Sequence, residues 1–270
     1  MSRQLMGRLR NRAALMDKTR SVAWDLDAPM ASFTFDDFPA DALEVGGRIL
    51  KEEANACGTY YVSGCFMGKT IDGIKFYEEG HLKDAAAQGH EIGCHAFQHE
   101  KLGQQGPRFA RQTCEDNAAF VRDILGSGVK MTSFAYPYGD TSLTVKSALS
   151  KKFEYCRGVR QELNTGKVDR GQISVISLEI RHAAYVDIKR TVADAVANKS
   201  WIVFLTHDIR ENPSPYGSTP AMLENAVKAV TEAGIQILPL RDAAIRGFKK
   251  PQLAVSSPGL WVPGSATAYS

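Results

Sequence analysis

The strongest constraint on this 270-residue chain is a regular alternation of short apolar segments with longer amphipathic ones. Eight segments are rich in apolar and β-prone residues and are short enough to be strands: 30–36, 58–64, 89–95, 132–138, 153–159, 173–180, 201–207 and 235–240. Helical patterns fill most of the intervals between them: 41–55, 76–88, 108–125, 141–151, 186–199 and 219–233. Strands that alternate with helices build parallel sheets. The pattern therefore predicts an α/β fold, and one continuous stretch of this length favours a closed (β/α) barrel over an open sheet.

Composition excludes several classes of protein. Apolar residues make up 44% of the chain and charged residues 23%, which is typical of globular proteins. No apolar run approaches the length of a membrane helix, so we expect no integral membrane segment. The formal net charge is +3, but residues 1–20 alone carry six basic groups and one acidic group. The other 250 residues hold 27 basic and 29 acidic groups, and this balance predicts no nucleic-acid partner.

The basic N-terminal segment has the pattern of a helix and lacks the long apolar run of a signal peptide. Apolar residues recur at helical spacing within residues 3–19, namely Leu5, Leu9, Ala13 and Met16. We therefore predict that residues 1–29 are a basic helical lead-in. It lies on the main domain or on a neighbouring subunit or, as an alternative, on a membrane surface. The five cysteines have no CxxC spacing, so a chain that starts naturally at Met1 is expected to be cytoplasmic.

Ionisable residues gather at the carboxyl ends of the predicted strands. Asp36 and Asp37 end the first strand, His95 ends the third, and His207 ends the seventh. In a barrel of parallel strands all carboxyl ends meet at one face, which is where active sites are built. Groups far apart in the sequence are therefore expected to converge at that face.

His95 and His99 have the spacing of a metal-binding pair. If the chain turns helical after the strand, both imidazoles lie on one face of the helix. One carboxylate from Asp36 or Asp37 completes a His-His-Asp set, and three protein ligands with an open position are typical of a catalytic Zn²⁺ or similar cation. Adjacent side chains in an extended segment diverge, so one aspartate can face the metal while the other activates water. His207 would supply the acid.

Four short motifs follow one another along the chain. They are Thr34-Phe35-Asp36-Asp37, then Gly89-His90-Glu91-Ile92-Gly93 leading into His95 and His99, then Phe134-Ala135-Tyr136-Pro137-Tyr138-Gly139, then Leu205-Thr206-His207. In this order they resemble the polysaccharide deacetylase family, the NodB-homology domain also called carbohydrate esterase family 4. The resemblance implies a distorted (β/α)7-type barrel in a single catalytic domain over residues 30–248, with a C-terminal tail at 249–270. It also implies a metal-dependent hydrolase that removes acetyl groups from an N-acetylated sugar or oligosaccharide.

The resemblance further implies roles for individual residues. Asp36 would be the general base, His207 the general acid, and the backbone N–H of Tyr138 would stabilise the oxyanion. The metal ligands would be Asp37, His95 and His99. The ion would be one divalent metal, with Zn²⁺ as the first choice and Co²⁺, Ni²⁺ or Mn²⁺ as alternatives. The expected partner is an acetylated carbohydrate, whereas the sugar and the oligomeric state are left open.

The chain departs from the family pattern at three places. Ala135 stands where many members have an arginine that tunes the catalytic aspartate, and Ala96 stands where they have serine or threonine. The family's fourth motif, an Asp-Trp element near the acid histidine, has no good counterpart. Arg157, in the fifth predicted strand, is our candidate to replace the missing guanidinium and pair with Asp36, with Arg181 as second choice.

Two other functions compete with deacetylation. One is a C–N hydrolase that acts on a small amide or cyclic imide, which relatives of this fold also perform and which suits a cytoplasmic chain. The other is a glycan-binding protein without turnover, which Ala135 and the missing fourth motif favour. The complete set of aspartates and histidines in the motifs argues against the second alternative.

Overall fold

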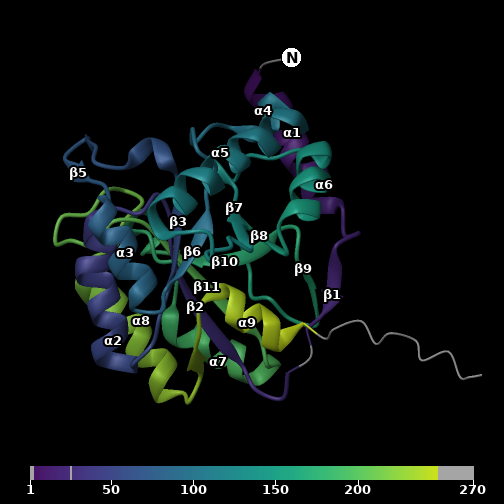
Figure 1. The fold of residues 1–270 in the computed structure, drawn as a ribbon. Helices are drawn as coiled ribbons and strands as arrows, with labels where there is room; N and C mark the ends of the chain where they lie inside the picture. Colours follow the sequence, from purple (N-terminus) through teal and green to yellow (C-terminus); the bar gives the residue numbers. More distant parts are fainter. Residues whose placement is uncertain (1–2, 25, 249–270) are drawn as a thin grey trace, which may run out of the picture.

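The computed structural model describes residues 3–24 and 26–248, and its centre is a ring of parallel strands (Figure 1). In order around the ring, the strands are β2 (Met30–Phe35), β3 (Thr59–Val62), β6 (Glu91–Cys94), β7 (Ser133–Ala135), β8 (Tyr155–Gln161), β10 (Ile173–Ser177) and β11 (Trp201–Thr206). Hydrogen bonds between β11 and β2 over the full length of both strands close the ring. The predicted (β/α)7-type barrel is therefore confirmed.

The barrel is irregular beside β2. The eighth predicted strand is reduced to β12 (Gln236–Ile237), which pairs with the first two residues of β2. β3 pairs with the last two residues of that strand. One edge of β2 is fully paired with β11. The other edge pairs first with β12 and then with β3, and this shared edge accounts for the distortion of the ring.

Helices cover the outside of the ring and fall within the predicted helical intervals to within a few residues. They are η1 (Ala42–Gly47), α2 (Arg48–Ala54), α3 (Glu79–Ala87), α5 (Pro107–Leu125), α6 (Leu143–Lys152), α7 (Ile188–Asn198) and α8 (Pro220–Glu232). The first interval opens as the π-helix η1 before it becomes α2. α8 begins as predicted, because the Thr219 hydroxyl accepts a hydrogen bond from Met222 N at 3.2 Å and Pro220 occupies the first turn.

Shorter elements decorate this frame, and the sequence did not predict them. They are β1 (Ser21–Ala23) paired antiparallel with β9 (Lys167–Asp169), the hairpin of β4 (Thr70–Ile71) and β5 (Ile74–Lys75), α4 (Leu102–Gln105), α9 (Leu240–Gly247), and the 3₁₀ turns η2 (Gly64–Phe66), η3 (Pro137–Gly139) and η4 (Ile180–His182). Most of them are two to four residues long, too short to show a period. All five cysteines are unpaired thiols.

Apolar side chains seal the amino-terminal end of the barrel. The rings of Trp24 and Trp201 stack with their centroids 4.9 Å apart, and Phe248 meets Trp24 edge-on at 5.4 Å. Leu240 and Ala244 of α9 are fully buried in the same cluster. A pocket inside this barrel must therefore open at the carboxyl ends of the strands, where the predicted site residues lie.

The N-terminal helix α1 (Arg3–Met16) is confirmed as a helix, but its packing differs from the prediction. Ala14 is fully buried, and Asn11 Oδ1 accepts a hydrogen bond from Thr141 N at 2.8 Å. Leu9 and Met16, which were predicted to lie on the packing face, are 47% and 78% exposed. The orientation of the helix therefore follows its polar contacts, such as the one to Asn11, more than the apolar residues Leu9 and Met16.

A buried lysine fixes the end of this helix. Lys146 of α6 is fully buried, and its Nζ donates to the Ala14 carbonyl oxygen at 2.8 Å and to Asp169 Oδ2 at 2.6 Å. In the part of the chain that the structure describes, no helix is long and apolar enough to cross a membrane. The predicted tail at 249–270 lies outside the described residues.

Candidate metal centre and active site

A pocket of about 460 Å³ opens at the carboxyl ends of the barrel strands. Six of the residues predicted from the sequence line it: Asp36, Asp37, His95, His99, Tyr138 and His207. The seventh, Arg157, is fully buried behind Asp36. The structure thus brings together all of the predicted site residues, which extend from Asp36 to His207 in the sequence.

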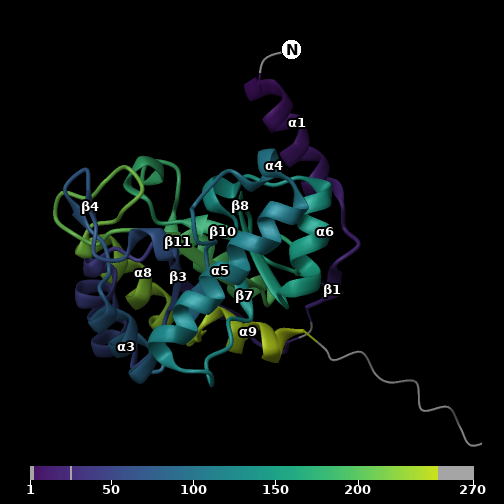
Figure 2. The ribbon, with the colours of Figure 1, turned by 45° about the horizontal axis from the view of Figure 1, so that its top comes forward.

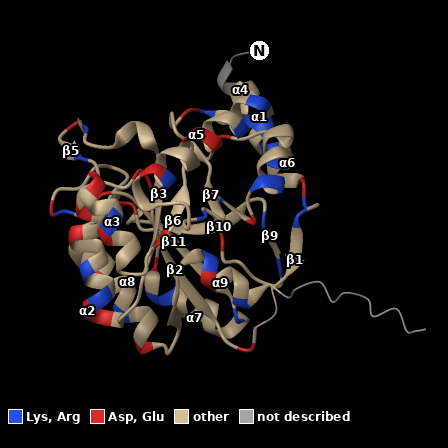
Figure 3. Ribbon diagram, in the orientation of Figure 1, with Lys and Arg blue, Asp and Glu red and all other residues tan. Residues whose placement is uncertain are grey.

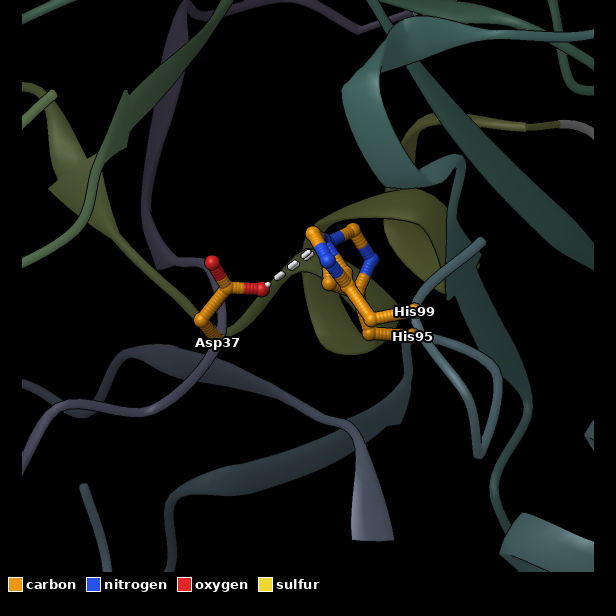
Figure 4. A group of neighbouring side chains, drawn as sticks. All are labelled: Asp37, His95 and His99. Atoms are coloured by element: carbon orange, nitrogen blue, oxygen red, sulfur yellow. Dashed lines mark ion pairs between the residues drawn. The ribbon is translucent and has the colours of Figure 1, made fainter. Parts of the chain in front are cut away.

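The two aspartates after β2 reach different partners because the backbone turns between them. Asp36 continues the strand, and its N–H donates to the Thr206 carbonyl oxygen at 3.0 Å. Asp37 adopts a left-handed φ of 64°, which is uncommon for a residue other than glycine. Its Oδ1 lies 3.4 Å from Nε2 of His95 and 3.1 Å from Nε2 of His99 (Figure 4).

His95 and His99 meet through a loop, so the condition of a helical turn after the strand is not met. Ala96 and His99 both have positive φ, at 60° and 50°, and residues 95–99 contain no helical turn. The two imidazole centroids are nevertheless 4.9 Å apart. The two side chains converge as expected. They are brought together by the left-handed backbone of Ala96 and His99 and not by the period of a helix.

Both imidazoles are held in the neutral form that a metal ligand requires. Nδ1 of His95 lies 2.8 Å from the Ala135 carbonyl oxygen, and because a carbonyl can only accept, this nitrogen carries the ring proton. Burial lowers the pKa of His95 to about 4, and it lowers the pKa of His99 as well. Nε2 of His95 therefore presents a lone pair towards Asp37 at neutral pH.

The three side chains fit a bound divalent cation. Their donor atoms all lie within 4.8 Å of one another. Asp37 Oδ1 is buried and accepts no hydrogen bond from the described residues, although two ring nitrogens lie close to it. Two ligand atoms that bind one Zn²⁺ at about 2.0–2.2 Å with tetrahedral angles are roughly 3.4 Å apart, which matches the observed separations. A lone pair and a carboxylate at this distance repel each other unless a cation lies between them.

Arg157 contacts Asp36, as the sequence predicted. Its Nη2 donates to both oxygens of the Asp36 carboxylate. Arg157 is the register partner of Ala135 across the β7–β8 ladder, so the guanidinium arrives from the strand next to the one on which many family members carry theirs. Burial raises the pKa of Asp36, but the charge of Arg157, the nearby His95 and His207 and the hydrogen bonds from Arg157 together outweigh this effect and hold the pKa below its ordinary value.

Glu179 is a charged residue of the pocket that the sequence analysis missed. It is buried, and its Oε1 lies 3.6 Å from Nδ1 of His207. Its Oε2 accepts hydrogen bonds from Ser177 Oγ at 2.8 Å and from Arg181 Nη2 at 2.8 Å. Arg181, the second choice for the partner of Asp36, therefore pairs with Glu179. A signal was available, because Glu179 is the charged residue at the end of the predicted strand 173–180.

His207 and Tyr138 lie where their backbone segments turn away from the barrel. Nδ1 of His207 is 3.2 Å from the Tyr216 carbonyl oxygen, so this nitrogen is the donor and Nε2 remains for the pocket. Tyr138 has a left-handed φ of 58° within η3, and its ring centroid lies 4.6 Å from that of His99. The oxyanion role of the Tyr138 N–H stays a prediction.

The sequence profile of one known family, described as polysaccharide deacetylase, matches residues 24–155. Over these residues the chain is similar to the polysaccharide deacetylase family. The match includes the cluster of Asp37, His95 and His99 but ends before Arg157 and His207. No curated protein matches the sequence.

Solved structures of polysaccharide deacetylase relatives share the fold. A family 4 acetyl xylan esterase from Clostridium thermocellum, in complex with a cobalt ion, aligns with a TM-score of 0.52 and 20% identity over 80% of this chain and 91% of that one. Peptidoglycan deacetylase PdaC from Bacillus subtilis aligns with a TM-score of 0.51 and 17% identity over 82% and 92%. A CE4 family pseudoenzyme from Bacillus anthracis aligns with a TM-score of 0.53 and 13% identity over 80% and 66%.

Proposed function

We propose that this protein is a metal-dependent hydrolase that removes acetyl groups from an N-acetylated sugar or oligosaccharide. The observation that carries the proposal is the buried Oδ1 of Asp37, which lies without a hydrogen-bond donor among the described residues beside the neutral rings of His95 and His99. The polysaccharide deacetylase match and the cobalt ion of a structural neighbour support it. Zn²⁺ suits the donor set best, and Co²⁺, Ni²⁺ or Mn²⁺ are alternatives.

The residues around the cluster divide the work of hydrolysis among them. A divalent ion held by the cluster would polarise the acetyl carbonyl and make a water easier to deprotonate. Asp36, kept ionised by Arg157, accepts the proton of the attacking water on its carboxylate. The Tyr138 N–H donates to the carbonyl oxygen as negative charge develops there. His207, oriented through its Nδ1, donates a proton from Nε2 to the departing amine.

The rim of the pocket favours a sugar as the substrate. Tyr138 and Tyr216 both line the pocket, and their side chains are 61% and 48% exposed. Exposed aromatic rings at a pocket mouth offer flat apolar faces with a polar hydroxyl, which suit the C–H face of a pyranose. A small amide or cyclic imide, the substrate of the alternative C–N hydrolase, would leave both rings without a contact.

Acetate release from N-acetylchitotetraose tests the proposal. We expect the Zn²⁺-loaded protein to release acetate, a chelator to abolish the release, and added Zn²⁺ to restore it. Asp36→Asn, which keeps the size of the side chain and removes the base, should also abolish it. Ammonia or a ring-opened product from an imide would favour the C–N hydrolase instead. Oligosaccharide binding without acetate release would favour the glycan-binding protein.

A further inference from the structure

A second cavity, of about 380 Å³, lies beside the active-site pocket and shares Tyr138 with it as a wall. The remaining walls include Gly7, Arg8 and Asn11 from α1 and Lys101 and Gln104 from the segment around α4. In Figure 2, α1 and α4 lie close together at one end of the barrel. Because α1 precedes the residues that the polysaccharide deacetylase profile matches, this wall lies outside the family segment.

The helix that forms this wall is fixed to the barrel and is part of the folded unit. Asn11 accepts a hydrogen bond from Thr141 N at 2.8 Å, one turn beyond Gly7 and Arg8. The buried Lys146 donates to the Ala14 carbonyl oxygen at 2.8 Å. These contacts come from α6 and the residues just before it, so the cavity between α1 and Tyr138 is a built feature of the fold.

The second cavity is cationic. Arg8 and Lys101 form no ion pair with the described residues, and Nζ of Lys101 lies 5.4 Å from the centroid of the Tyr138 ring. Figure 3 shows further basic residues along α1. The carboxylate in the lining, Asp140, is already engaged, because its Oδ2 accepts a hydrogen bond from Gly103 N at 2.8 Å. Arg8 and Lys101 outnumber this one carboxylate, and the net positive charge of the lining favours an anionic ligand.

We propose that this cavity is a subsite for an anionic group, a carboxylate or a phosphate ester, on a sugar unit next to the one that is deacetylated. Arginine binds either group through its planar fork of donors, and lysine binds it as a point charge. Because Tyr138 borders both cavities, an oligosaccharide that occupies both passes over its exposed ring. The preferred substrate is then an acidic N-acetylated oligosaccharide. This inference rests on the proposed function for the position of the reacting acetyl group.

A binding experiment tests the subsite without turnover. The probes are a hyaluronan tetrasaccharide, which alternates N-acetylglucosamine with glucuronic acid, and N-acetylchitotetraose, which is neutral and of the same length. A 6-phosphorylated N-acetylchitotetraose forms the third arm and separates a phosphate preference from a carboxylate preference. Dissociation constants are measured by calorimetry on the full chain in the presence of a chelator.

The variant that tests the cations is Arg8→Gln combined with Lys101→Gln, and Arg12→Gln is its matched control. Arg12 is exposed on the same helix and does not line the cavity. We expect the double variant to bind at least one anionic probe about tenfold more weakly than the wild type does, since two partly exposed charge pairs are lost. Arg12→Gln should change the dissociation constant by less than about twofold.

Each outcome decides the inference. A loss confined to the hyaluronan arm assigns a carboxylate, and a loss confined to the phosphorylated arm assigns a phosphate. Equal affinities of the wild type and the double variant, an equal loss in Arg12→Gln, or no binding of either anionic probe would overturn it. Thermal melting of both variants at the wild-type temperature excludes a folding defect. Because the readout is binding, a failure to release acetate would contradict the proposed function and not this subsite.

Discussion

The metal side of the pocket and its acid side differ in how they hold their charges. On the metal side, Asp37, His95 and His99 converge from two loops, and a carboxylate oxygen is left without a donor among the described residues. On the acid side, Glu179 pairs with Arg181 and lies beside His207. The first arrangement would be completed by the proposed divalent cation. The second is complete by itself and can serve to orient a proton donor.

The same division appears in the family match. The profile covers the metal side but ends before Arg157, Glu179 and His207. The roles on the acid side therefore depend on the geometry of this chain. Variants on the two sides can therefore separate the contribution of a bound ion to catalysis from the contribution of the charged residues around His207.

The largest effect is expected on the metal side, from His95→Ala. The variant removes one of three ligands, so we expect bound metal to fall well below one equivalent. We also expect kcat/KM for acetate release to fall by about 10³-fold, because several kcal/mol of charge stabilisation is lost. Elemental analysis and acetate release measure the two quantities. His81→Ala changes a histidine that pairs with Glu44 outside the pocket and should retain both. Undiminished turnover by metal-free His95→Ala would refute the role of the cluster.

A smaller effect is expected where the two sides meet, from Arg157→Met. Burial then dominates the pKa of Asp36, so this pKa rises and the base form is lost at a higher pH than in the wild type. The acid limb of the kcat/KM profile should move to higher pH, with a loss of about 10–100-fold at neutral pH. The free energy of unfolding should fall by about 3–5 kcal/mol, because a buried carboxylate loses its partner.

Arg157→Lys keeps the positive charge and separates the two effects of the Arg157→Met variant. We expect its acid limb to lie between those of the wild type and Arg157→Met, since a lysine cannot reproduce the planar fork of the guanidinium. An acid limb that stays in place in both variants would show that Arg157 has only a structural role.

The smallest effect is expected on the acid side, from Glu179→Gln. The substitution keeps the shape of the side chain but removes the charge beside His207 and Arg181. We expect kcat to fall by about tenfold while KM changes little, because the ring of His207 is less firmly oriented. Glu162→Gln is the matched control, since Glu162 is exposed and pairs with Arg160. A comparable loss of kcat in that control would argue against an orienting role for Glu179.

Most of the barrel could be predicted because its strands are buried on both faces. All six residues of β2 and all six of β11 are buried, and such strands appear in the sequence as mainly apolar segments. The pairing of Arg157 with Asp36 was also predictable, since the parallel strands of a barrel bring residues from distant parts of the sequence to one face. Spacing and strand order are therefore enough to predict the position of residues that lie in the paired strands of the barrel.

Prediction failed where local backbone or polar contacts decide the structure. The loop from His95 to His99 depends on left-handed Ala96, a residue type that gives no signal for positive φ. Glu179 was overlooked although it is the charged residue at the end of the predicted strand 173–180, the kind of position at which the other site residues were found. The predicted orientation of α1 was wrong because hydrophobic periodicity does not include the hydrogen bond that Lys146 donates to the end of the helix.

The hydrogen bonds from Lys146 to the end of α1 and to Asp17 also limit how far the protein can be truncated from its N-terminus. Its ammonium is fully buried and pairs with the Asp169 carboxylate, and it donates further hydrogen bonds to the carbonyl oxygens of Ala14 and Asp17. Cutting the chain before Ser21 would remove both carbonyls and open one side of the burial site at the same moment. Residues 3–20, which precede the barrel in sequence, therefore help to support it.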